Sequence, residues 1–190
     1  MAARAERRQR GEGAASRPDA IRIDVGHTVT WAARGMAMRF LELKVPPLAV
    51  LILFALAVFG AGRWLPSGNL PFVASGASAL AAIVAGVGVA LAGVVQFRRT
   101  GTTVDPLAPE RASALVEAGV YRWTRNPMYL GMALVLLGGA LWWGSVPGLA
   151  LVGGFCAYLT RFQILPEERA LQAIFGASYV DYTRRVRRWI

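Results

Sequence analysis

Long apolar runs constrain this chain more than any other feature. Four stretches with almost no charged residues cover residues 46–61, 72–97, 127–143 and 146–164. A helix needs about 20 apolar residues to cross a hydrocarbon core about 30 Å thick. The charged fraction of the chain is 17%, below the roughly 25% of an ordinary soluble domain. The sequence therefore predicts an all-α integral membrane protein with about four transmembrane helices.

The composition of the runs predicts how the helices pack. Only Gly144 and Ser145 separate the third and fourth runs, so we expect a tight helical hairpin there. The second run is rich in Gly, Ala and Ser, which let helix backbones approach closely in lipid, and we expect this helix inside the bundle. Residues 166–189 place apolar side chains at helical spacing beside arginines, which predicts a C-terminal amphipathic helix.

Arginines indicate the orientation in the membrane. The net charge of +10 is almost wholly arginine, since Lys44 is the one lysine. The arginines gather in the N-terminal segment and in residues 98–126 and 166–190, whereas the turn at 62–71 carries one. This positive-inside pattern predicts cytoplasmic termini and a cytoplasmic middle segment. It favours contact with membrane lipids and argues against nucleic acid.

The domain organisation is simple. Residues 1–35 are polar and predict a disordered or interfacial extension, and residues 36–190 predict a single membrane domain. Cys156 and His27 are each the one residue of their kind. We therefore expect no disulfide framework and no metal site.

Two polar junctions are candidates for chemistry. Asn126-Pro127 opens the third run, where the asparagine side chain is a plausible N-cap and the free N–H groups form an anion site. Glu167 and Glu168 follow the fourth run, which contains Arg161. Ionisable groups at this depth are costly and favour a functional site. The alternative is structural: an interfacial helix start, and acidic residues that suit a helix dipole.

Taken together, the segments resemble the isoprenylcysteine carboxyl methyltransferase family, especially its bacterial members, which is related to the phospholipid N-methyltransferases. The resemblance covers residues 41–190 and rests on "LELKVPPLAV", "FRRTGTTVDP", "LVEAGVYRWTRNPMYLG" and "PEERALQAIFGASYVDYTRRVRRW", in this order. It implies a cytosolic site in which the terminal segment packs on the loop before the third span and encloses S-adenosylmethionine. By resemblance the cofactor contacts are Ser113, Ala114, Leu115, Val116, Tyr121, Asn126, Pro127, Met128, Tyr129 and Glu167.

The catalytic candidates are Arg161 or Arg125, to orient an anionic acceptor, with Glu168 assisting. Eukaryotic members of the family place histidine where this chain has Asn126, and their substrate-side arginine aligns near Gln163, with Arg161 nearby. Asparagine does not titrate near neutrality, which suits a carboxylate acceptor because that nucleophile needs no general base.

The expected reaction is methyl transfer to a carboxylate of a lipidic or prenylcysteine-like acceptor. Five alternatives stay open: a phospholipid amine, a small thiol or an isoprenoid acid as acceptor, a non-catalytic membrane scaffold, and a reductase that uses a nicotinamide cofactor. The sequence does not decide the acceptor or the oligomeric state.

Overall fold

The structure is a computed structural model that describes residues 42–65, 76–101, 109 and 112–190. All of these residues belong to one unit, Met38–Ile190. Within these ranges every regular element is helical and none is a strand, which confirms the predicted all-α class. The predicted N-terminal extension, residues 1–35, lies outside the described residues.

The elements follow the predicted order of the apolar runs. They are α2 (Pro47–Trp64), α3 (Gly76–Thr100), the short 3₁₀ helix η2 (Gly119–Arg122), α4 (Pro127–Trp142), α5 (Val146–Leu159), the π-helical turn η3 (Thr160–Ile164), α6 (Leu165–Phe175) and α7 (Ala177–Arg185). In the described part of the chain, three helices are long and apolar enough to cross a membrane: α2, α3 and the continuous helix Val146–Phe175. The apolar helix α4 is shorter, with 16 residues.

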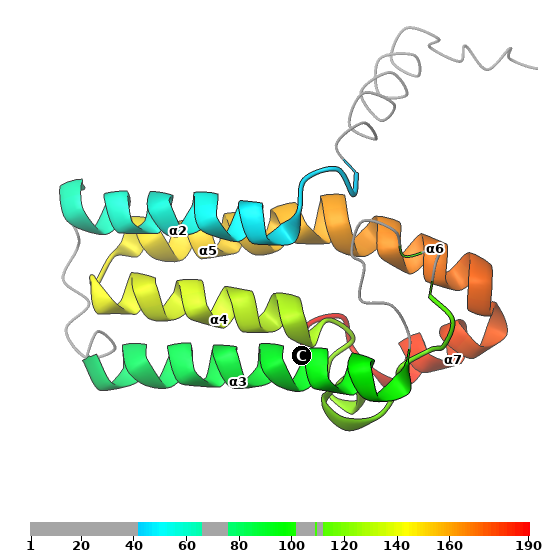
Figure 1. Cartoon of the computed structure of the whole chain (residues 1–190). Coiled ribbons are helices and arrows are strands. Elements are labelled where there is room, and N and C mark those ends of the chain that lie inside the picture. Colours follow the sequence, from blue (N-terminus) through cyan, green and yellow to red (C-terminus); the bar gives the residue numbers. More distant parts are fainter. Residues whose placement is uncertain (1–41, 66–75, 102–108, 110–111) are drawn as a thin grey trace, which may run out of the picture. The chain divides into compact units, whose positions relative to one another are not determined.

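Helix α4 lies at the centre of the bundle and contacts α2, α3 and α5 (Figure 1). Its buried residues Tyr129, Ala133, Leu136 and Ala140 lie on one face, and the buried Gly131 and Gly138 lie on the opposite face against α3, as expected for a helix that is enclosed by its neighbours. A second buried cluster joins Tyr179, Tyr182 and Val186 of the C-terminal segment.

Helix α3 lies at the edge of the bundle, so the prediction that the small-residue helix sits inside was wrong. One stripe, containing Ala79, Gly86 and Gly93, is buried, and the other faces are largely exposed. A Cβ added at Gly86 would come within 2.6 Å of the Gly131 carbonyl oxygen on α4. The small residues therefore serve one close helix–helix contact rather than burial on all sides.

The predicted hairpin between α4 and α5 is confirmed. Gly144 adopts a φ of 58°, a left-handed conformation that glycine tolerates, and lies in the short turn between the two helices. The Ser145 hydroxyl then caps α5 by accepting a hydrogen bond from the Gly148 N–H at 3.0 Å.

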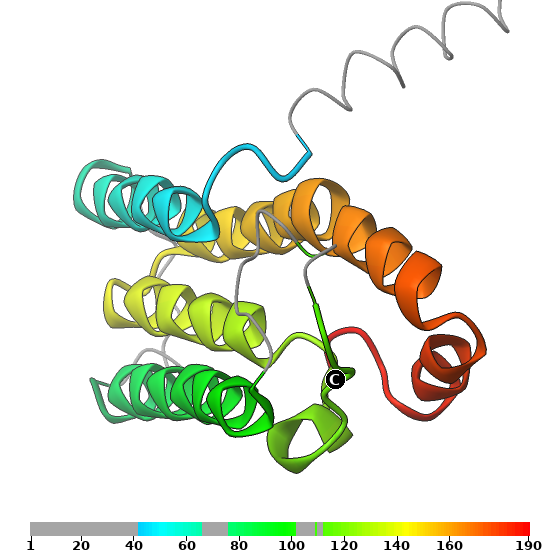
Figure 2. The same ribbon diagram turned by 45° about the vertical axis from the view of Figure 1, so that its right-hand side comes forward.

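The last membrane helix does not end before Pro166. Helices α5 and α6 continue through η3 as one helix of 30 residues, Val146–Phe175, so Glu167 and Glu168 project from the same rod that forms the span. The prediction of a single helix over 166–189 was wrong, because Gly176 (φ 54°) ends α6 and begins α7. The resulting turn directs α7 back toward the bundle (Figure 2).

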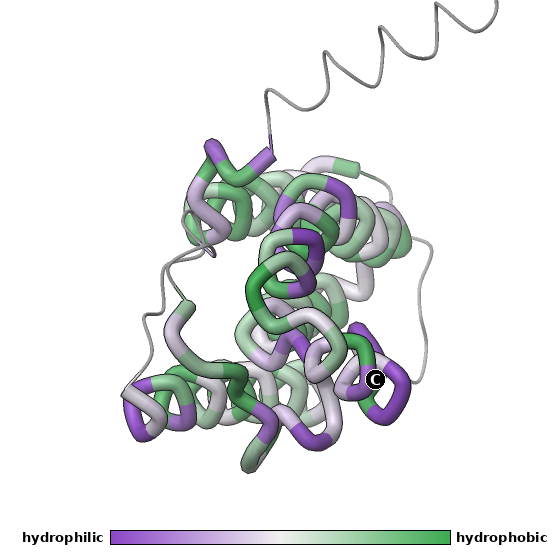
Figure 3. Tube along the Cα trace, turned by 90° about the vertical axis from the view of Figure 1, so that its right-hand side faces the viewer, coloured by the Kyte–Doolittle hydropathy of each residue, from purple (hydrophilic) through white to green (hydrophobic). Residues whose placement is uncertain are grey.

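Polar segments gather at one end of the bundle. The beginning of α2, the end of α3, residues 112–126 and helices α6 and α7 all lie at this end, opposite the α4–α5 hairpin (Figure 1). Seen from this end, hydrophilic residues face the viewer at α3, α6 and α7 (Figure 3). The two polar segments meet as predicted, while their position relative to the cytoplasm remains a prediction.

Candidate functional site

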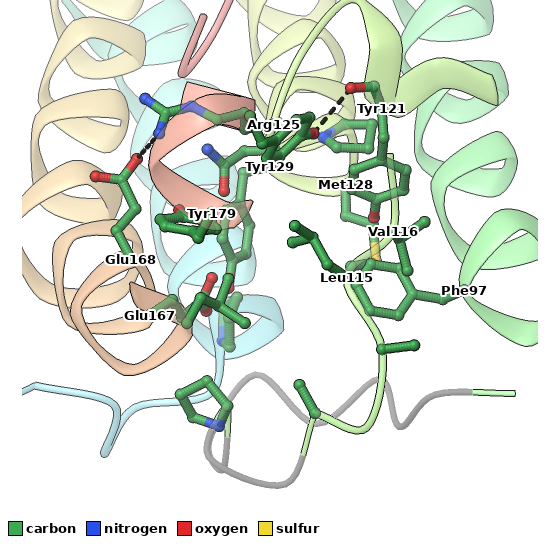
Figure 4. Close-up of a pocket in the computed structure, with 18 of the residues that line it drawn as sticks. Phe97, Leu115, Val116, Tyr121, Arg125, Met128, Tyr129, Glu167, Glu168 and Tyr179 are labelled. Carbon is green, nitrogen blue, oxygen red and sulfur yellow. Dashed lines mark hydrogen bonds and ion pairs between the residues drawn. The ribbon is translucent and has the colours of Figure 1, made fainter. Parts of the chain in front are cut away.

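A cavity of about 290 Å³ opens at the polar end of the bundle. It is formed by the beginning of α2, the end of α3, Pro109 and residues 112–116, the junction of η2 with α4, and helices α6 and α7. Figure 4 shows Glu167, Tyr129 and Tyr179 on one side of the opening and Phe97, Leu115 and Val116 on the other. Most of the lining is apolar, with a few polar groups that converge on it, which is typical of a small-molecule site.

Of the predicted site residues, all but Ser113 and Arg161 line this cavity. They are Ala114, Leu115, Val116, Tyr121, Arg125, Asn126, Pro127, Met128, Tyr129, Glu167 and Glu168. Ser113 is exposed beside the cavity. Arg161 does not line the cavity, and its Nη1 is 2.7 Å from an oxygen of Glu42.

Tyr129 and Glu167 form the central polar contact of the cavity. The Tyr129 hydroxyl, in the first turn of α4, donates a hydrogen bond to the Glu167 carboxylate, in the first turn of α6. Tyr129 is held in place because its ring is buried in the main core cluster. The contact therefore fixes the Glu167 carboxylate against the N-terminal turn of α4.

Glu168 is held between two arginines. Arg188 donates from Nε at 3.0 Å and from Nη2 at 2.7 Å, one bond to each carboxylate oxygen. Arg125 Nη1 lies 3.2 Å from the same carboxylate, and the Arg125 and Glu168 side chains are only 12% and 15% exposed. The hydrogen bonds to Glu168 raise the pKa of Arg188. The two arginines and one carboxylate leave one net positive charge at the cavity wall.

Arg188 also anchors the C-terminal segment through its backbone. Its carbonyl accepts hydrogen bonds from Asn126 Nδ2 at 3.0 Å and from the Thr124 hydroxyl at 3.3 Å. Asn126 occupies the N-cap position of α4, but its side chain makes no capping hydrogen bond. The predicted cap was therefore wrong in its bonding: the amide holds the chain terminus instead of the helix.

Tyrosines form the remaining polar wall. The Tyr182 hydroxyl donates to the Tyr121 carbonyl at 2.8 Å, and the Tyr121 ring packs edge-on against Phe97 with centroids 5.2 Å apart. The buried Tyr121 hydroxyl has no hydrogen-bond partner among the described residues. Burial, followed by the nearby Tyr182 and Glu167, raises the pKa of Tyr121. Its hydroxyl therefore keeps its proton and is available as a donor inside the cavity.

Tyr179 and Tyr182 also remain protonated near neutral pH. Burial, with a smaller contribution from Glu168, raises the pKa of Tyr179 to about 12, although Arg125 opposes the shift. Burial and the neighbouring Tyr179 raise the pKa of Tyr182 as well.

Several lining residues were not among the sequence candidates. They are Pro46, Pro47, Leu48, Phe97, Pro109, Ala112, Met132, Leu171, Tyr179 and Tyr182. Leu171, Tyr179 and Tyr182 belong to the apolar stripe that predicted an amphipathic helix, and only the turn at Gly176 shows that this stripe faces the cavity.

Comparison with known proteins identifies the family. The family model described as phospholipid methyltransferase matches residues 75–178, more than half of the chain. The chain belongs to the phospholipid methyltransferase family. The predicted relationship to membrane methyltransferases is thereby confirmed.

Two relatives of this family member are informative. An uncharacterized protein of Haemophilus influenzae is 42% identical over 65 residues, which are 33% of this chain and 100% of that protein. The protein-S-isoprenylcysteine O-methyltransferase of Saccharomyces cerevisiae is 33% identical over 85 residues, which are 40% of this chain and 32% of the yeast enzyme. No solved structure matches the chain.

The family match and the structure agree on where the site lies. Residues 75–178 include the lining residues Tyr121, Tyr129, Glu167 and Glu168 and end just before Tyr179, so the wall that contains Tyr179 and Tyr182 lies outside the matched region. With its long apolar helices, this phospholipid methyltransferase family member is an integral membrane protein.

Proposed function

We propose that the chain is an S-adenosylmethionine-dependent membrane methyltransferase that transfers a methyl group to the carboxylate of a lipidic or prenylcysteine-like acceptor. The observation that carries the proposal is the cavity, which brings together the residues that the family resemblance assigned to the cofactor. They come from the 112–116 loop, the 121–129 segment and α6, which are separate in the sequence.

The residues present fit the proposed cofactor. Glu167 offers a carboxylate to an amine or to ribose hydroxyls, and the buried Nε of Arg125 has no hydrogen-bond partner among the described residues. The Tyr121 hydroxyl is likewise without a partner there. Phe97, Leu115 and Val116 supply an apolar wall for a nucleobase. When bound, S-adenosylmethionine supplies a methyl group that its sulfonium already activates.

The protein then contributes alignment and exclusion of water. The Tyr129–Glu167 contact fixes one polar anchor, and the apolar lining removes water from around an incoming carboxylate. Arg125, beside the cavity, supplies a positive charge toward an anionic acceptor. A carboxylate attacks without losing a proton, so no general base is required.

A phospholipid amine is the second candidate acceptor. The family description favours it, and so does Glu167, because a carboxylate that accepts a hydrogen bond from Tyr129 inside the cavity is also placed to accept a proton from an ammonium group.

We further propose four membrane crossings, with both termini and the cavity on the cytoplasmic side of a bacterial inner membrane. Helix α4 is about 24 Å long at 1.5 Å per residue. It lies between α2, α3 and α5, and none of its residues from Pro127 to Leu141 is exposed.

Transfer of a labelled methyl group from S-adenosylmethionine tests the proposal. The purified protein in lipid nanodiscs is offered a prenylcysteine analogue, phosphatidylethanolamine or a small thiol. Label in the prenylcysteine ester supports the first candidate, and label in the phospholipid amine supports the second. Absence of transfer together with absence of cofactor binding would leave a membrane scaffold as the better account.

A further inference from the structure

The segment before α2 is fastened to the last membrane helix. We call residues 42–45 the strap. Its contacts are with η3 and α6, and they join residues about 120 positions apart: Glu42 with Arg161, and Val45 with Gln163.

Two hydrogen bonds fix the backbone of the strap. Pro166 has no N–H, so the Phe162 carbonyl four residues earlier lacks its helical donor, and the Leu43 N–H takes that place at 3.1 Å. The Gln163 side chain is fully buried, and its Nε2 donates to the Val45 carbonyl at 2.6 Å. Leu43 has a φ of 56°, a backbone conformation that leucine rarely adopts. These contacts therefore hold the strap in a conformation that is unfavourable for its own backbone.

Glu42 fastens the other end of the strap through two ion pairs. Its side chain is 12% exposed, and it contacts Arg161 of η3 at 2.7 Å as well as Arg169 of α6, about two turns further along the same helix. Arg161 is thus occupied by the strap and does not reach the cavity.

The strap leads directly into one wall of the cavity. Val45 is followed by Pro46, Pro47 and Leu48, which line the cavity and are apolar. Proline fixes φ, so the two consecutive prolines restrict the backbone between the strap and this wall. A displacement of the strap should therefore displace the wall as well. The polar groups assigned to the cofactor, including Tyr129 and Glu167, come from α4 and α6 instead.

We propose that Glu42 and Gln163 are positioning residues that hold the Pro46–Leu48 wall and thereby set the affinity for the apolar part of the acceptor. This inference rests on the proposed function for the nature of the acceptor. It assigns Arg161 to the strap, and it predicts that the cofactor site works independently of the strap.

The test measures binding, so it does not require turnover. A fluorescent farnesylcysteine probe and S-adenosylhomocysteine are titrated separately into the full-length protein in nanodiscs, and hydrogen exchange is followed in the peptide that contains Leu43 to Val50. The variants are Glu42→Gln and Gln163→Leu, with Asp181→Asn as control, because Asp181 forms an exposed ion pair with Arg184 on α7. Glu42→Asp serves as the conservative variant.

We expect both strap variants to speed exchange in this peptide and to weaken probe binding about five-fold, on the scale of one lost polar contact. Binding of S-adenosylhomocysteine should stay within two-fold of wild type, Asp181→Asn should match wild type in all three measurements, and Glu42→Asp should recover part of the probe affinity. Unchanged exchange, or equal losses for probe and S-adenosylhomocysteine, would overturn the inference. If the probe binds as expected but no methyl transfer occurs with any acceptor, the proposed function fails while the role of the strap stands.

Discussion

Tyr129 and Glu167 lie 38 residues apart in the sequence, yet the hydroxyl of the first donates a hydrogen bond to the carboxylate of the second. Tyr129 sits in the first turn of α4 and Glu167 near the beginning of α6, so the contact joins α4 to the long helix Val146–Phe175 at the cavity. Because every proposed step at this site depends on that carboxylate, it is the first group to change.

Glu167→Gln should abolish cofactor binding without unfolding the protein. The amide retains the shape of the side chain and removes the charge that we assign to the cofactor's polar groups. In a thermal unfolding experiment, S-adenosylhomocysteine should raise the midpoint of wild type and leave that of the variant unchanged. Glu117→Gln is the control, because Glu117 pairs with Arg185 outside the cavity. A full ligand-induced shift in Glu167→Gln would remove Glu167 from the site.

Arg188→Gln should loosen the cavity wall. It removes two charge-assisted hydrogen bonds and leaves Arg125 as the partner of Glu168 in the described part of the chain. Since the Arg188 side chain is 35% exposed, we expect the free energy of unfolding to fall by about 1 kcal/mol. The thermal unfolding midpoint should then fall by about 2–4 °C. The neighbouring Arg187→Gln, at an exposed position, should have little effect. Equal unfolding midpoints for the two variants would contradict a stabilising role for the contact between Arg188 and Glu168.

Tyr121→Phe and Tyr182→Phe should separate a ligand contact from a structural one. The Tyr121 hydroxyl is buried and unpartnered in the described structure, so its removal should leave stability unchanged or slightly raised and weaken binding of S-adenosylhomocysteine. The Tyr182 hydroxyl donates to a backbone carbonyl, so its removal should cost about 1 kcal/mol of stability. The opposite pattern in urea or thermal unfolding would assign the roles the other way round.

Gly86→Ala and Gly88→Ala form a matched pair on α3. An added Cβ at Gly86 would lie 2.6 Å from the backbone oxygen of Gly131, whereas one at Gly88 meets nothing within 4 Å. We expect Gly86→Ala to push α3 from α4 and cost about 2–3 kcal/mol. Gly88→Ala should be neutral or stabilising, because alanine has the better helix propensity. Similar unfolding midpoints would show that the two helices do not pack this closely.

Alkaline pH should destabilise the protein through its buried tyrosines. The pKa of Tyr179 is raised to about 12 in the folded protein, against about 10 in an unfolded chain. A raised pKa means that the folded state holds the proton more tightly than the unfolded chain. The contribution of this proton to the stability of the folded protein is therefore fully present below pH 10 and is lost as pH rises toward 12. Thermal midpoints measured across this range should fall, and the fall should be smaller in Tyr179→Phe. A midpoint independent of pH in this window would contradict the burial of these hydroxyls.

Hydropathy and charge predicted the features that depend on local composition. The apolar runs gave the helices, the Gly144-Ser145 step gave the hairpin, and the arginine pattern placed residues 98–126 and 166–190 at one end. The family resemblance also predicted that residues 126–129 and Glu167 contact the cofactor, and all five of these residues line one cavity in the structure.

The remaining features depend on contacts between distant segments. The sequence predicted that Arg161 orients the acceptor, because nothing in the fourth apolar run shows that Arg161 pairs with Glu42, which is 119 residues away. Asn126 looked like a helix cap because the Arg188 carbonyl that its amide contacts lies 62 residues away. Gly176 is one glycine within a periodic pattern, and that pattern does not show that its φ is positive and that α6 ends there.

The unbroken rod from Val146 to Phe175 has 30 residues, about 45 Å at 1.5 Å per residue and so about 15 Å more than the hydrocarbon core. We expect Glu167 and Glu168 to stand on the part that extends beyond the lipid. A thinner or thicker bilayer changes the tilt of such a helix, and the carboxylates should follow because the helix runs without interruption from the span to them. We therefore expect acyl-chain length of the surrounding lipid to change the depth at which the cavity meets the headgroups.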